Sequence, residues 1–86
     1  MKLEIVEQIL NHLKTFISGL KKTNIKLNKD NEVDKIIIKT RKNLKVLYED
    51  LKCLYDVELI GGSDEILEVN YIQNDKKLKF IFKKTY

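Results

Sequence analysis

Two alternating segments near the end of the chain, separated by a two-residue loop, constrain its fold most strongly. Apolar and polar residues alternate over 65–72 and over 77–84, and Asn74-Asp75 lies between them. Partners across such a loop have residue numbers that sum to 149. Three of the resulting pairs are apolar and share one face: Tyr71 with Leu78, Val69 with Phe80 and Leu67 with Phe82. The same rule pairs Glu65 with Lys84 and Asn70 with Lys79. A shift of one residue would separate all three apolar pairs, so we predict an antiparallel hairpin in this register.

The first twenty or so residues have the periodicity of an amphipathic helix. Apolar residues recur at alternating spacings of three and four, and Ile5, Ile9 and Phe16 widen the apolar stripe. Acidic residues stand in the first turns and Lys21-Lys22 stand at the end, which is the arrangement that the helix dipole favours. We therefore predict a helix over residues 2–21, with Gly19 near its fraying end.

The middle of the chain predicts an interior strand followed by a second helix. Residues 33–40 contain Ile36-Ile37-Ile38, which place apolar side chains on both faces of a strand. Leucines then recur at helical spacing over residues 41–55, and Thr40 is the expected N-cap of this helix. Residues 25–27 and 57–60 are candidates for short strands, and Gly61-Gly62-Ser63-Asp64 is expected to form a turn.

The order of these elements indicates one α+β domain over residues 1–86. We expect two helices packed on one face of a three- to four-stranded antiparallel or mixed sheet that ends in the β-hairpin. Eighty-six residues are enough for one hydrophobic core and too few for two. The chain is 43% hydrophobic, which is more apolar than a disordered protein, and no linker divides it.

The sequence also predicts where the protein is found. Its longest aliphatic run, Ile36-Ile37-Ile38, is far shorter than the ~18 apolar residues that a membrane span needs. The chain begins Met1-Lys2-Leu3-Glu4, without the apolar block of a secretory signal. A single cysteine, Cys53, excludes an internal disulfide. We expect a cytoplasmic protein with no membrane insertion.

Residues that carry catalysis or bind metals are scarce. His12 is the only histidine and stands beside the apolar stripe of the first helix, with no carboxylate in the sequence pattern to orient it. Cys53 stands one turn from acidic residues, which would raise the pKa of a thiol rather than activate it. One histidine and one cysteine cannot form a metal cluster of the usual spacing. We expect no enzyme activity, no cofactor and no metal.

Charge is distributed in blocks, and one of them is a candidate nucleic-acid surface. The net charge is +4, yet residues 21–45 carry nine basic and three acidic groups while residues 46–75 have a net charge of −7. The candidate contacts are Lys21, Lys22, Lys26, Lys39, Arg41, Lys42 and Lys45. Lys77, Lys79 and Lys83 add charge on the outward face of the last strand. Arginine is almost missing, however, and Phe80 and Phe82 are needed for the core. A solvated lysine surface, enriched by an AT-rich genome, is the competing interpretation.

The apolar face of the first helix is the candidate docking surface. Ile5, Ile9 and Phe16 extend the stripe beyond what one small sheet easily covers. A well-buried core helix is the simpler interpretation. The alternative is that part of this face binds a partner protein or a second copy of the chain.

Residues 32–84 resemble a known family. A lysine-flanked strand over 33–39 leads into a helical run over 43–52, followed by a short strand and turn at 54–60 and by Asp64. The alternating hairpin comes next, with Glu68-Val69-Asn70-Tyr71 on its first strand. This pattern is similar to the N-terminal domain of the thirty-kilodalton subunit of respiratory NADH:quinone oxidoreductase and to the related small subunit of energy-converting hydrogenases. The resemblance implies a domain that binds no cofactor and fixes the catalytic and iron–sulfur subunits to one another.

We therefore expect a non-catalytic protein–protein interaction subunit of a larger cytoplasmic complex, or of a homodimer. The alternative is a small nucleic-acid-binding or regulatory protein, of a kind that mobile elements carry, which uses the basic block at residues 21–45.

Overall fold

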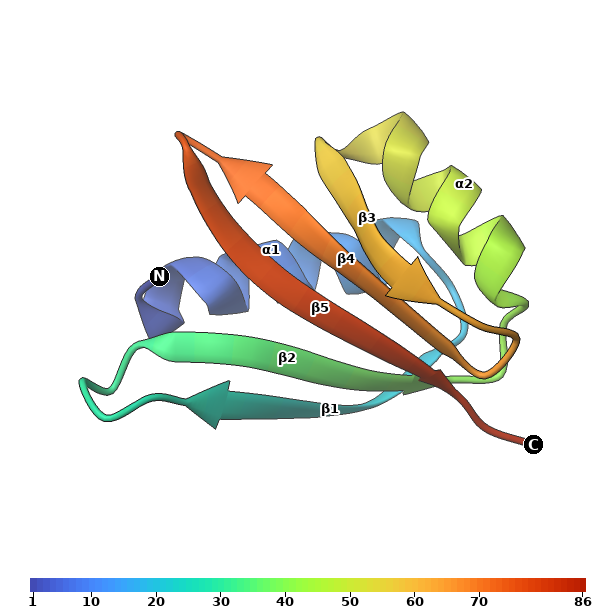
Figure 1. Cartoon of the computed structure of the whole chain (residues 1–86), viewed down its shortest axis with the longest axis horizontal. Coiled ribbons are helices and arrows are strands. Elements are labelled where there is room, and N and C mark those ends of the chain that lie inside the picture. Colours follow the sequence, from blue (N-terminus) through green and yellow to red (C-terminus); the bar gives the residue numbers. More distant parts are fainter.

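The computed structural model describes all 86 residues as two helices and five strands (Figure 1). The elements follow one another as α1 (Leu3–Phe16), β1 (Leu20–Leu27), β2 (Val33–Thr40), α2 (Leu44–Leu54), β3 (Val57–Gly62), β4 (Ile66–Gln73) and β5 (Lys76–Lys84). Neither helix is long and apolar enough to cross a membrane.

The strands form one mixed sheet in the order β1-β2-β5-β4-β3. Neighbours are antiparallel except β2 and β5, which run parallel at the centre of the sheet. The α+β class and the mixed sheet confirm the prediction, but the expected count of three to four strands was wrong. Both candidate short strands form: β1 begins five residues earlier than expected and β3 ends two residues later, because each pairs with a neighbour along most of its length.

The predicted register of the C-terminal hairpin is confirmed. Tyr71 pairs with Leu78, and the two apolar pairs beyond it follow as expected. The loop residues Asn74 and Asp75 have φ angles of 51° and 63°, which is the left-handed conformation that a two-residue hairpin turn of type I′ requires. Asn and Asp tolerate this conformation better than other non-glycine residues.

The first helix is shorter than predicted, and the residues expected at its end form the start of an edge strand. The helix ends at Phe16, Ile17 is already extended, and Gly19 turns the chain with a φ of 83°. The hydroxyl of Thr40 donates a hydrogen bond to the Gly19 carbonyl, with 2.7 Å between the oxygens. Helical periodicity continued through Leu20 in the sequence, so only this contact with β2 reveals where the helix stops.

The second helix also begins later than predicted. Asn43, rather than Thr40, is its N-cap, and the Asn43 side chain accepts hydrogen bonds from the backbone N–H groups of Lys45 and Val46. Thr40 is instead a fully buried residue of β2, where its hydroxyl also accepts from the Lys42 N–H. The turn expected at residues 61–64 falls slightly later, because both glycines pair with β4 as the end of β3.

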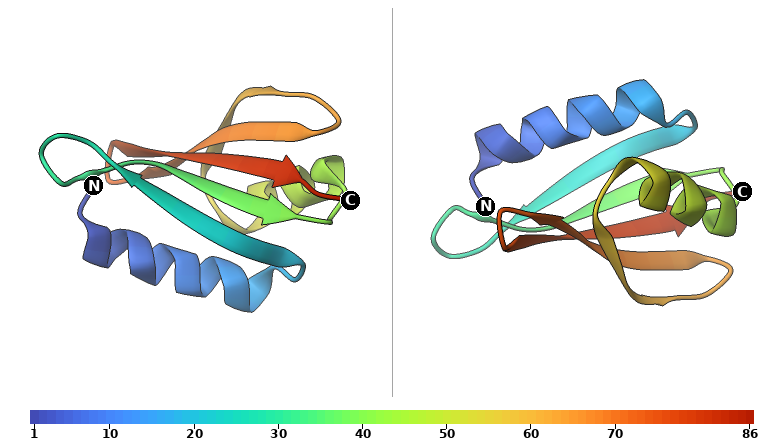
Figure 2. Two further views of the ribbon diagram at one scale, coloured as in Figure 1. Left: turned by 90° about the horizontal axis from the view of Figure 1, so that it is seen from below. Right: turned by 90° about the horizontal axis from the view of Figure 1, so that it is seen from above.

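A single core lies between the helices and one face of the sheet. Fifteen of its sixteen buried apolar residues come from the two helices and from β2, β4 and β5, and the other is Ile17, directly after α1. Figure 2 shows α1 on one side of the sheet, alongside β1. The opposite face carries no helix, and in Figure 1 it is turned toward the viewer. Each central strand therefore has one face in the core and one open face.

Replacing Gly19 with alanine should destabilise the fold through backbone conformation alone. A Cβ at this position would meet its nearest neighbours, Lys42 and Thr40, at ordinary contact distances of 3.8 and 3.9 Å. The left-handed φ remains unfavourable for alanine, so we expect Gly19→Ala to lose about 1–2 kcal/mol in urea unfolding. Gly61→Ala is the control, because its φ is not positive and its Cβ would meet nothing within 4 Å. Equal losses in the two variants would contradict this explanation.

Candidate functional site

A cleft between the two helices is the first candidate site. It has a volume of about 380 Å³ and lies between α1, the end of α2 and the end of β4. Its lining residues are Ile5, Gln8, Ile9, His12, Leu54, Tyr55, Tyr71 and Gln73. None of them is an acidic residue, lysine or arginine, although 35% of the chain is charged.

The local sequence explains how each wall of the cleft forms. On α1, Ile5, Gln8, Ile9 and His12 recur at spacings of one, three and four, so they lie along one helical face. On the other wall α2 ends at Leu54, and the extended backbone that follows directs the chain into β3. The cleft is thus formed where the end of one helix lies beside the middle of the other.

A line of aromatic rings connects this cleft with the core. Nδ1 of His12 and the hydroxyl of Tyr55 form a hydrogen bond that links residues 43 positions apart. The ring of Tyr55 contacts that of Tyr71 edge to face, with 5.6 Å between their centres, and Tyr71 contacts Phe80 in the same way at 6.4 Å. At the surface end the ring of Phe16 lies 4.5 Å from that of His12. The cleft is therefore built on groups that the core holds in position.

The three predicted docking residues lie on this side of α1 but differ in exposure. Ile5 is 39% exposed and Phe16 is 59% exposed, whereas Ile9 is 8% exposed and belongs to the core. Ile5 and Ile9 line the cleft, and the ring of Phe16 contacts that of His12 next to it at a tilt of 43°. Sequence reasoning missed Leu54, Tyr55 and Tyr71, because only the packing of α2 and β4 against α1 brings them there.

The second candidate site is the open face of the sheet. A hollow of about 280 Å³ is lined there by Lys22, Asn24, Lys26, Ile37, Lys39 and Lys83. It contains three of the seven predicted nucleic-acid contacts: Lys22, Lys26 and Lys39. The other four lie elsewhere. Lys42 forms an ion pair with Asp50 at 3.1 Å, and Lys21, Arg41 and Lys45 are exposed outside the hollow.

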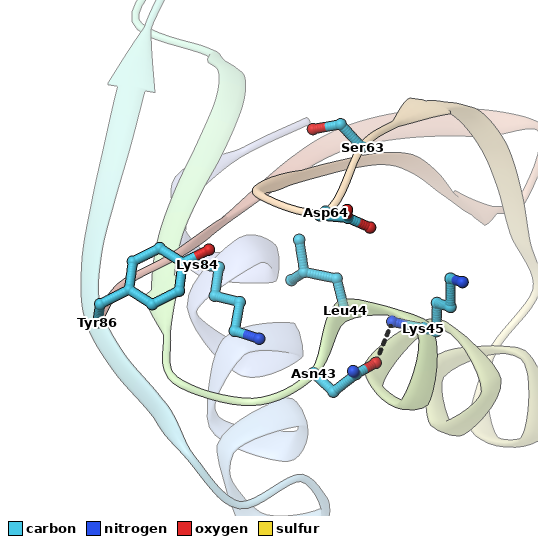
Figure 3. Close-up of a pocket in the computed structure, with 7 residues that line it drawn as sticks. All are labelled: Asn43, Leu44, Lys45, Ser63, Asp64, Lys84 and Tyr86. Atoms are coloured by element: carbon cyan, nitrogen blue, oxygen red, sulfur yellow. Dashed lines mark hydrogen bonds between the residues drawn. The ribbon is translucent and has the colours of Figure 1, made fainter.

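A third hollow, shown in Figure 3, lies at the start of α2. Asn43 and Lys45 approach it from the helix, Ser63 and Asp64 from the turn after β3, and Lys84 from the end of β5. The Asn43 carboxamide is already occupied in capping the helix. The Asp64 carboxylate opposes the binding of an anion, and the two lysines oppose the binding of a cation. The lining therefore favours neither an anionic nor a cationic ligand.

The candidate catalytic residues are not brought together. His12 is bonded to the Tyr55 hydroxyl, and Cys53 is an exposed free thiol on α2. No group of three His, Cys, Asp or Glu side chains is arranged to hold a metal ion.

Comparison of the chain with known protein families, with curated proteins and with solved structures finds no match. The family resemblance of residues 32–84 therefore stays a prediction. The evidence on function comes from the cleft between the helices and from the open face of the sheet.

The Tyr55 phenol makes stability depend on pH in a defined direction. Its burial raises its pKa above the ordinary value near 10, and the neighbouring Tyr71 phenol raises it further. The unfolded chain thus loses this proton at a lower pH than the folded chain does. The free energy of unfolding should fall as pH rises above about 10, while below that pH the group has no effect.

Urea unfolding between pH 8 and pH 11 checks this expectation. The stability of Tyr55→Phe should fall less steeply over this range than that of the unmodified protein. Tyr48→Phe is the control, since Tyr48 is another partly buried tyrosine and contacts Lys52 instead. If both variants parallel the unmodified protein, Tyr55 is not the source of the pH dependence.

Proposed function

We propose that this chain is a non-catalytic docking domain that binds a partner protein of a larger cytoplasmic assembly through the α1–α2 cleft. The observation that carries the proposal is an uncharged, partly aromatic cleft in a chain rich in charge. The cores of protein interfaces are depleted of charged residues and enriched in aromatic ones. Half-exposed Leu54 and Ile5 are large apolar side chains at its two walls.

The contacts among the residues that line the cleft support the same function. The hydrogen bond between His12 and Tyr55 and the ring contact between Tyr55 and Tyr71 hold the lining before any partner arrives. A preformed site loses less conformational entropy when it binds. Tyrosine also buries a large area with few rotatable bonds, which is why it is common among the residues that dominate binding energy.

The occupant that best fits this cleft is the apolar face of a helix from another protein. A groove between helices accepts such a face as a row of apolar side chains. A second copy of this chain is a poorer occupant, because a two-fold axis through the cleft would place one concave surface against another. The docking role implied by the family resemblance is of the same kind, since that domain joins other subunits.

Affinity purification from nuclease-treated native extract, followed by binding measurements with the purified partner, tests the proposal. Leu54→Ser should weaken binding of that partner at least tenfold, which corresponds to about 1.4 kcal/mol, because it removes an apolar contact from the cleft wall. Val46→Ser is the matched control: Val46 is also on α2 and is 51% exposed, against 45% for Leu54, but does not line the cleft.

The control variant should bind the partner as the unmodified protein does. Equal weakening by both variants, or by neither, would exclude the cleft as the docking site. Light scattering of the purified protein tests whether a second copy of the chain occupies the cleft. A dimer that Leu54→Ser dissociates would identify that copy as the partner.

A further inference from the structure

The register of the sheet arranges lysines in two rows across the open face. Lys26 pairs directly with Lys35, which in turn pairs directly with Lys79 on β5. Lys39, which is four residues after Lys35 on β2, pairs with Lys83 on β5. At the pairing midway between them, Asn24, Ile37 and Ile81 lie side by side across β1, β2 and β5. The hollow on this face is thus bordered by lysines on both sides and has an uncharged floor.

Most of these lysines have no acidic partner. The ion pairs on the sheet are Lys79 with Glu68 and Lys77 with Glu58, both on the β4–β3 side. Lys22, Lys26, Lys35, Lys39 and Lys83 form none. Positive charge is therefore concentrated over β1, β2 and β5.

This arrangement opposes folding, because like charges directly opposite one another on neighbouring strands destabilise a sheet. Three such pairs occur here: Lys26–Lys35, Lys35–Lys79 and Lys39–Lys83. Of these lysines Lys79 alone has an acidic partner, Glu68, so the other two pairs are not neutralised. A polyanion lying between the rows would remove the repulsion.

We propose that the open face of β1, β2 and β5 binds the phosphate backbone of a single-stranded nucleic acid without reading its sequence. Such binding generally combines a basic groove that follows the backbone with aromatic rings that stack on the bases, and this face provides the first of the two. The face has no aromatic ring for base stacking and no arginine for contacts to base edges, so the interaction is with phosphates. This proposal is independent of the cleft between the helices, which lies on the other side of the sheet.

Two other anionic partners fit the face less well. A lipid surface binds proteins that insert apolar side chains between headgroups, whereas Ile37 and Ile81 are only partly exposed and lie on the floor between the lysine rows. Protein interfaces favour arginine and are depleted of lysine, whereas every charged residue of this hollow is a lysine.

Fluorescence anisotropy with a labelled twenty-nucleotide poly-dT strand tests the proposal on the full chain. For four phosphate contacts, affinity should fall about fifty-fold between 50 and 200 mM NaCl. The double variant Lys35→Gln/Lys39→Gln should bind at least tenfold more weakly at 50 mM NaCl. Lys14→Gln/Lys45→Gln is the control with the same change in net charge, and its affinity should stay within about threefold of the unmodified protein.

Thermal unfolding at low salt gives a second readout, because it shows whether the double variant is folded when its binding is weaker. Because Lys35→Gln/Lys39→Gln removes repulsion, its midpoint temperature should be equal to or higher than that of the unmodified protein, and poly-dT should raise the midpoint less than it does for the unmodified protein. Absence of binding at 50 mM NaCl, or equal weakening in the two double variants, would overturn the proposal. So would tighter binding to vesicles containing phosphatidylserine, or to polyglutamate, than to poly-dT.

Discussion

The parallel pairing of β2 with β5 is the interaction on which the rest of this structure depends. It joins residues 35–40 to residues 79–84, which are more than forty positions apart in the chain. Without it, β1–β2 and β3–β4–β5 would be two separate antiparallel ribbons, each with an additional exposed edge. Ile36, Ile38, Phe80 and Phe82 lie on these two strands and are almost completely buried. Both helices cover the face that these four side chains create, so the core exists only once this pair has formed.

The same pairing determines the open face. Side chains alternate between the two faces of a strand, so the register that buries Ile36 beside Phe80 also places Lys35 beside Lys79. A shift of one strand by a single residue would bring lysines into the core. The core therefore fixes the positions of the lysines. Lys79 has an acidic partner, Glu68, and the repulsion among the other lysines is relieved by counterions, by substitution or by a bound polyanion.

Features that depend on local sequence could be predicted, and those that depend on distant contacts could not. The register of the C-terminal hairpin was predicted correctly, because a two-residue loop and three apolar pairs allow only one register, although each strand begins one residue away from its predicted start. The end of α1 was missed, since Leu20 continues the helical pattern and only its pairing with Thr40 assigns it to β1. The predicted docking residues Ile5 and Phe16 were found exposed, but Tyr55 and Tyr71, the opposite wall of the cleft, come from elements whose packing no periodicity encodes.

The two candidate sites differ in how they relate to stability. The cleft is lined by Ile9 and Tyr71, which also contact the core, so substitutions that remove binding there also remove packing. The lysine rows contribute little to the core and oppose one another, so substitutions there separate binding from stability. Packing alone is a sufficient reason for an apolar residue in the cleft. Packing gives no reason for three lysine pairs in register, so the open face indicates a ligand by an argument that does not depend on the cleft.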